Sequence, residues 1–300
     1  MTARSILRFV LPMVLSVAPL SSRAQTTVAK PPERAVRRDI PMTRMIQRAF
    51  AANTRDSTGR PGRNYWQLWT DYRINARLDP TTSIITGRET VTIRNNSDST
   101  MRSVVLRLDQ NFFLPNVPRL EAASELTDGM QITRLVANGQ AIDVGDTLGA
   151  QLPGSPRRSA PIATILRNTS ARIPLATPIA PHSAGTLEAD WRFRVPRADN
   201  GRGERMGRWA DTLYQVAQWY PRVAVFDDLR MGWDTEPYLG PAEFYNNYGH
   251  FDVSIDVPAG WIVGSTGVLQ NPTEVLTPTA RERLSHVLDS DSIRSIVSSA

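Results

Sequence analysis

Period-two alternation of apolar and polar residues is the feature that most limits what this 300-residue chain can fold into. Alternation of this kind is typical of strands with one buried face. The alternating sets are Tyr72, Ile74, Ala76 and Leu78; Gly87, Glu89, Val91 and Ile93; Val104, Leu106 and Leu108; Leu187, Ala189, Trp191, Phe193 and Val195; and Phe251, Val253, Ile255 and Val257. In the last set we expect Asp252, Ser254 and Asp256 to face outward.

Turn signals separate these segments. Asp79-Pro80-Thr81 and Asn95-Asn96-Ser97-Asp98 each close a predicted strand, and Asn138-Gly139 predicts a hairpin within 132–144. No segment between Tyr65 and Gln270 has a convincing helical pattern. Many short strands without intervening helices predict an all-β fold, an antiparallel β-sandwich or saddle over residues 64–270.

Helical patterns lie on either side of this domain. Pro41 suits a first helical position, and Met42, Met45, Ile46 and Phe50 share a face, which predicts a short helix at 41–53. It lies in an Arg- and Pro-rich arm, 25–63, that we expect to be flexible. A second helix is expected over Pro278–Leu288, with Thr277 as its N-cap. We expect 271–300 to be a truncated linker toward an absent catalytic domain.

The first 24 residues resemble an export signal. Arg4 and Arg8 precede an apolar stretch from Phe9 to Leu20, and small residues surround a cleavage point after Ala24. The apolar stretch is shorter than the roughly 20 residues that span a bilayer. We therefore expect a periplasmic or secreted protein with no membrane contact after cleavage; an uncleaved anchor is the alternative.

The charge distribution argues against nucleic-acid binding. The formal net charge is +6, but 12 basic and 3 acidic residues lie at or before Arg63, which leaves 23 basic and 26 acidic residues for the remainder. The predicted domain is thus near neutral. The absence of cysteine excludes disulfides, thiolate metal ligands and thiol catalysis. The sequence gives no signal for an oligomeric state.

Local catalytic motifs are missing. None of His182, His250 and His286 belongs to an HExxH pair, and no serine lies in a G-x-S-x-G elbow. The glycine-rich segment Gly201–Gly207 lacks the Lys-Ser/Thr of a P-loop and is interpreted as a hairpin tip. His182 and His250 are interpreted as solvated side chains.

Aromatic residues and carboxylates gather in Gln218–Pro258. This segment contains Trp219, Tyr220 and Trp233, together with Asp227, Asp228, Asp234, Glu236 and Glu243. Carboxylates so placed can serve as a glycosidase pair or as calcium ligands, but the spacing fits neither signature. Acidic loops on a packed sandwich are the simpler interpretation.

Several segments resemble the N-terminal domain of the aminopeptidase-N-like zinc metallopeptidases (the M-one family, gluzincins), in particular a bacterial exported branch. The similarity extends from about Tyr65 to Leu276, and the order and number of the segments carry it. They are Tyr72–Asp79, Ile85–Ser97, Leu106–Asn111, Trp191–Pro196, Arg205–Arg208, Gln218–Arg222, Asp227-Asp228, Glu243–Tyr245, Tyr248-Gly249 and Thr266–Pro272.

The resemblance implies a β-saddle that precedes a thermolysin-like catalytic domain, in which HExxH and a downstream Glu bind zinc. This sequence holds neither, so it implies no catalytic residue, no metal ligand and no bound cofactor in this chain, which is expected to be inactive alone. Zinc and a peptide substrate are implied for the complete enzyme. The family's N-terminal domain lends a polar side chain to the substrate wall; Gln218 is the candidate, with Gln215 second. Trp219-Tyr220-Pro221 departs from the family's FPxxDEP-type pattern at this point.

Two functions remain open at the level of sequence. The chain is either the substrate-wall domain of an exported zinc aminopeptidase or a free-standing β-sandwich binding or scaffold module without enzymatic activity. In the first case, we expect Trp219, Tyr220 and Trp233 to pack at the junction with the catalytic domain, and Gln218 to face the cleft.

Overall fold

The computed structural model describes residues 41–144, 162–166, 168–198, 206–210, 212–242 and 244–298. The expected signal peptide, the arm as far as residue 40 and most of the glycine-rich segment Gly201–Gly207 lie outside these ranges. Within them, no helix is long and apolar enough to cross a membrane.

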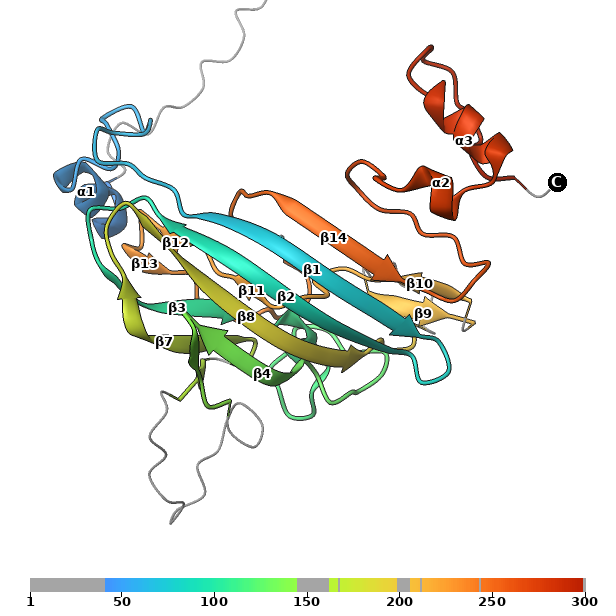
Figure 1. The fold of residues 1–300 in the computed structure, drawn as a ribbon. Helices are drawn as coiled ribbons and strands as arrows, with labels where there is room; N and C mark the ends of the chain where they lie inside the picture. Colours follow the sequence, from blue (N-terminus) through green and yellow to red (C-terminus); the bar gives the residue numbers. More distant parts are fainter. Residues whose placement is uncertain are drawn as a thin grey trace, which may run out of the picture. The chain divides into compact units, whose positions relative to one another are not determined.

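A six-stranded sheet forms one layer of the domain (Figure 1). Its order is β14-β1-β2-β8-β4-β5. The strands are β1 (Trp69–Asp79), β2 (Ile84–Asn95), β4 (Gln131–Ala137), β5 (Gln140–Ala141), β8 (Ser183–Arg194) and β14 (Phe251–Asp256). The long strands β1, β2 and β8 pair antiparallel over their whole lengths, and they follow the alternation in the sequence.

A four-stranded sheet of order β11-β3-β7-β6 forms the second layer. Its strands are β3 (Met101–Arg107), β6 (Thr164–Leu166), β7 (Ser170–Ile179) and β11 (Arg222–Val223). Ile74, Val91 and Leu187 from the first sheet share one buried core with Val104 and Ile173 from the second. The expected all-β sandwich is therefore confirmed.

Short elements complete the fold. They are the helix α1 (Arg44–Ala51), the 3₁₀ helix η1 (Asp109–Phe113), the hairpin strands β9 (Gly207–Trp209), β10 (Leu213–Gln215), β12 (Phe226–Asp227) and β13 (Gly232–Trp233), and the helices α2 (Pro272–Val275) and α3 (Pro278–Ser285). Helices thus flank the sandwich as expected. Thr277 caps α3, because its side chain accepts a hydrogen bond from the Ala280 N–H at 3.2 Å. The sequence pattern did not reveal η1.

The last strand differs from the expectation of an antiparallel sheet. β14 pairs parallel to β1, with Phe251 opposite Tyr72. The chain enters beside the start of β1, where Gly249 lies so close to the Thr70 carbonyl that a Cβ atom would stand 1.6 Å from its oxygen. Alternation in a sequence does not encode strand direction, so the pattern of β14 does not predict this parallel pairing.

β14 is also less covered than its pattern predicts. Phe251, Val253 and Ile255 continue the core face of β1, yet each is 40–50% exposed. On the other face, Asp252 and Asp256 pair with arginines of β1. The exposed large hydrophobic side chains after β14 are Ile262, Val263, Val268, Leu269, Val275, Val287, Leu288, Ile293 and Val297. This edge of the sheet and the segment after it thus present apolar surface to solvent.

Glu89 is a carboxylic acid inside the core. It points from β2 into the apolar interior, is 1% exposed, and neither carboxylate oxygen has a hydrogen-bond partner. Burial raises the pKa of Glu89 well above its ordinary value, and the nearby Trp191 indole opposes this shift. Burial of the Tyr220 hydroxyl likewise raises the pKa of Tyr220 to about 12. Burial therefore favours the neutral, protonated form of Glu89.

We predict that Glu89 makes the stability of the domain depend on pH. Because its pKa is raised in the folded state, the folded chain binds the extra proton between the unfolded value of 4.5 and the folded value. This contribution is complete below the unfolded pKa and is lost as pH rises through the folded pKa, with a limiting slope of about 1.4 kcal/mol per pH unit. Denaturant unfolding at several pH values should show this decline in the wild type and not in Glu89→Gln. Parallel curves for the two proteins would contradict the buried neutral acid.

Gly87 provides the space for the largest core side chain. It lies opposite Trp191 in the β2–β8 register, and an added Cβ would stand 2.1 Å from the Trp191 Cζ2 atom. The absence of a side chain at Gly87 lets the indole lie flat across β2.

We therefore predict that Gly87→Ala lowers the free energy of unfolding by about 1–3 kcal/mol, because the indole must move in a packed core. Gly264→Ala is the matched control, since nothing lies within 4 Å of its Cβ position. Its effect should stay within about 0.5 kcal/mol in the same denaturant titration. Equal effects of the two substitutions would show that Trp191 does not depend on the gap at Gly87.

Candidate functional site

The segment Gln218–Pro258 joins the two layers of the sandwich. It supplies β11 to the four-stranded sheet, the β12–β13 hairpin, and β14 to the six-stranded sheet. How this segment is fastened decides where its carboxylates, its rings and Gln218 lie.

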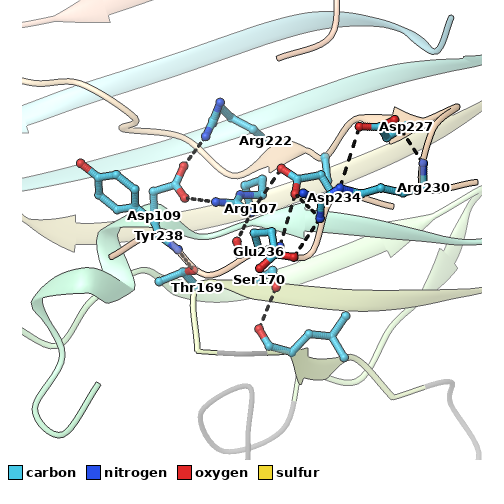
Figure 2. A network of polar contacts seen from close by, with 12 residues as sticks. Arg107, Asp109, Thr169, Ser170, Arg222, Asp227, Arg230, Asp234, Glu236 and Tyr238 are labelled. Atoms are coloured by element: carbon cyan, nitrogen blue, oxygen red, sulfur yellow. Dashed lines mark hydrogen bonds and ion pairs between the residues drawn. The ribbon is translucent and has the colours of Figure 1, made fainter. Parts of the chain in front are cut away.

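The 3₁₀ helix η1 fastens this segment through a buried carboxylate. Figure 2 shows Asp109 between two arginines, Arg107 from β3 and Arg222 from β11. Arg107 Nη2 lies 3.3 Å from Asp109 Oδ1, and Arg222 Nη2 donates to Asp109 Oδ2. The Asp109 side chain is 2% exposed, so the charges are compensated away from bulk water. Arg107 also donates to the Glu236 carbonyl, which draws the later loop onto the same cluster.

The two residues after Asp109 add contacts of a different kind. Gln110 Nε2 donates to the carbonyl oxygens of Ala217 and Gln218, at 3.2 and 3.1 Å. Asn111 donates to the Asn168 carbonyl and accepts from the Met130 N–H, each at 2.9 Å. Each side chain thereby satisfies backbone groups of loops that lack sheet partners at those atoms.

Sequence reasoning missed this cluster. At the level of sequence, Leu106–Asn111 is only one of the segments that resemble the metallopeptidase family. A usable signal was present, because three consecutive polar residues directly follow a strongly apolar strand. Polar residues in that position are buried only if they bind backbone or charge.

The carboxylates of the segment serve structural pairs. Asp228 accepts from Arg55 Nε and Nη2, both at 2.8 Å, and Asp234 lies 3.6 Å from Arg107. Glu236 accepts from Arg230 at 2.8 Å, as Figure 2 shows. Glu243 lies outside the described residues. This arrangement agrees with the interpretation of these groups as packed loop carboxylates.

The histidines lie apart from one another. His182 is bonded to Asp98 and His286 to Asp289, each at 2.7 Å, and both histidines are largely exposed. His250 lies beside the Trp69 ring at the entry to β14. Among the described residues, no group of three His, Cys, Asp or Glu side chains could hold a metal ion.

The structure places the two candidate glutamines differently. Gln215 is the last residue of β10 and is exposed. Gln218 lies in a loop and is half-buried; its backbone has φ of 47°, in the left-handed region that non-glycine residues adopt rarely. The hydrogen bond from Gln110 to its carbonyl holds this conformation. The Gln218 backbone is held by this hydrogen bond, so the position from which its side chain extends is defined. Gln215 lies at an exposed strand end.

Trp219, Tyr220 and Trp233, expected at the junction with a catalytic domain, pack against the core of the sandwich and are half-buried; their place at a junction stays a prediction. Trp219 lies 5.8 Å from Trp191 between ring centroids, and Tyr220 lies 5.3 Å from Tyr72. Trp233 contacts Phe226 and also packs on the core. These three rings thus make aromatic contacts within the sandwich, and Trp219 is the one that covers Trp191.

Comparison with known proteins gives a weak likeness. No protein-family model matches the chain, and neither does any curated protein. Among solved structures, an M1 zinc metallopeptidase from Deinococcus radiodurans matches with 15% identity and a TM-score of 0.34. A variant of an M1 zinc metallopeptidase from that organism, bound to a Tyr-Ser-Ala substrate, matches with 13% identity and a TM-score of 0.36. A two-domain M1 zinc metallopeptidase variant bound to L-arginine matches with 13% identity and a TM-score of 0.35.

Each of these three matches covers 70% of this chain and 37% of the solved chain. The chain thus spans well under half the length of these metallopeptidases. TM-scores below 0.5 do not establish a common fold, so the β-sandwich described above rests on the chain's own strands and core.

We predict that Asp109→Asn lowers the free energy of unfolding by about 3–5 kcal/mol, because it leaves the buried Arg222 without its carboxylate and Arg107 with Asp234 alone. Asp252→Asn is the matched control; its partner Arg73 is 3.4 Å away and both side chains are largely exposed, so the loss should be about 0–1 kcal/mol. Denaturant titration measures both. A cost for Asp109→Asn as small as that of the control would contradict the role of η1 as the anchor.

Proposed function

We propose that this chain is the N-terminal, substrate-wall domain of an exported zinc metallo-aminopeptidase. Peptide hydrolysis would take place in a separate catalytic domain that holds the zinc. In this account the chain supplies one wall of the peptide cleft and contributes no catalytic group.

One observation carries the proposal. Leu106–Asn111 and Gln218–Arg222 are two segments of the family resemblance that lie more than a hundred residues apart in sequence. In the structure they are joined by a side-chain-to-backbone hydrogen bond and by an ion pair. Asp109 pairs with Arg222, and Gln110 bonds the Gln218 carbonyl. Segments matched by chance have no reason to meet in this way. The contact supports the view that the resemblance describes a functional framework.

The apolar surface at β14 gives independent support. Phe251, Val253 and Ile255 continue a core face without cover, and apolar side chains recur in the segment up to Val297. Exposed apolar side chains in this number, gathered in one part of the chain, are consistent with an interface with another domain. We assign it to the catalytic domain, on the C-terminal side of the sandwich.

Gln218 is the proposed contact with substrate. Its amide carries both donors and an acceptor, so it can bind the backbone of a peptide's first residue without adding charge to the cleft. The left-handed backbone and the bond from Gln110 set the position from which the side chain extends. Gln215 remains the second choice because its strand end is exposed.

Zinc does not fit this chain. The described residues contain no three-ligand group, and the sequence has no HExxH. Activation of water by zinc requires three protein ligands and a general base. The chemistry of the complete enzyme is therefore assigned to the other domain, and export rests on the signal-like first 24 residues.

We expect the purified 300-residue chain to bind no stoichiometric zinc and to release no product from an aminoacyl-anilide. Elemental analysis and a colorimetric assay measure both. Zinc-dependent turnover by this chain alone would contradict the assignment of catalysis to another domain.

The DNA beyond codon 300, translated in all three frames, should encode HExxH and a downstream Glu; absence of this motif would exclude the aminopeptidase.

A further inference from the structure

A pocket of about 430 Å³ lies beside the entry to β14. Its volume falls within the range of roughly 300–1,000 Å³ that is usual for small-molecule sites. Three short segments line it: Tyr65–Leu68 before β1, the β12 region from Val225 to Asp228, and Phe244–Tyr248. The pocket shares no residue with Gln218, Gln215 or β14.

Aromatic residues make up half of the residues that line the pocket. Trp66 is fixed by Phe226 at 5.2 Å between ring centroids, and Phe226 is fixed in turn by Trp233 at 5.5 Å. Tyr245 and Tyr248 are 53% and 67% exposed. The pocket thus combines a rigid aromatic floor with accessible rings.

The charge in the wall is compensated internally. Asp228 accepts two hydrogen bonds of 2.8 Å from Arg55, in a bidentate pair. The Arg55 guanidinium also lies over the Tyr65 ring, 5.0 Å from its centroid, so the cation–π position on that ring is taken. An ammonium or a phosphate ligand would have to break this pair, which favours a neutral ligand.

The polar groups of the wall favour a ligand with hydroxyl groups. Asn247 Nδ2 donates to the carbonyl oxygens of Val223 and Ala224, at 3.0 and 3.1 Å. Both donors of this amide are thereby used, so the atom that it can offer to a ligand is the acceptor Oδ1. Gln67 Nε2 likewise donates to the Tyr65 hydroxyl at 2.9 Å, which leaves its Oε1 as an acceptor. A proline-rich peptide offers carbonyl acceptors and no N–H at proline, so it could use the tyrosine hydroxyl donors of the wall but not these two amide oxygens.

We propose that this aromatic pocket binds a neutral sugar residue of a glycan. The apolar C–H face of a pyranose ring stacks on the tyrosine rings, and its hydroxyl groups donate to the amide oxygens. A sugar needs no charge in the site, and its hydroxyl groups can also accept hydrogen bonds from the tyrosine hydroxyl groups of the wall. The site is distinct from the proposed peptide wall, so either one can fail without the other.

The test uses the intact 300-residue protein with maltotriose, cellotriose and chitotriose as probes. Saturation-transfer difference NMR, titrated to about 10 mM so that a dissociation constant near 1 mM is measurable, should show saturable binding of at least one probe. Tyr245→Ala should weaken that binding about tenfold or more, because it removes an aromatic contact at the mouth. Tyr245→Phe keeps the ring and should retain binding within about threefold.

Leu213→Ala is the control, since this side chain is similarly exposed and lies in β10, outside the pocket. It should bind the probe as the wild type does. Absence of saturable binding for all three sugars would overturn the proposal. So would equal binding by Tyr245→Ala and Leu213→Ala, or binding of a decaproline peptide that depends on Tyr245 without any sugar binding.

Discussion

The pairing of Asp109 with Arg107 and Arg222 is the interaction on which the functional half of this domain depends. The two sheets can form from alternating strands alone, but the segment from Gln218 to Pro258 makes few sheet contacts until it reaches β14. The buried ion cluster holds β11 and the following loop against β3, as Figure 2 shows. Because all three charged groups are largely removed from water, the cluster tolerates little displacement, and it therefore fixes the position of β11 relative to β3.

Fixing that position has consequences at two distant places. Gln110 sets the backbone of Gln218, which is the proposed contact with a peptide. On the other side, the same segment carries Phe226 and Asn247 to the pocket before β1. The two proposed sites thus share one support and have separate walls. A single buried turn after an apolar strand can in this way serve a loop-built surface on a rigid β scaffold.

The sequence predicts much of the fold and little of the site. Period-two alternation identifies β1, β2 and β8, because one face of each is buried along most of its length. In β3, residues 104–107 are buried on both faces. Alternation does not give the parallel direction of β14, because it is the same in parallel and antiparallel strands. It also does not give η1, whose polar residues are buried through partners more than fifty residues away, such as Asn168 and Arg222. Ion pairs and hydrogen bonds between segments far apart in sequence leave no periodic pattern in the local sequence.

The central claim is that a complete sandwich core here carries an uncovered edge, which another domain is proposed to cover. Hydrogen–deuterium exchange on the 300-residue chain, read by mass spectrometry, tests it most directly. The account predicts slow exchange in the paired strands β1, β2 and β8, and much faster exchange in β14 and in residues 258–298. Protection of β14 and of the following segment equal to that of β2 would contradict it, because it would show that this surface is already buried in the chain by itself.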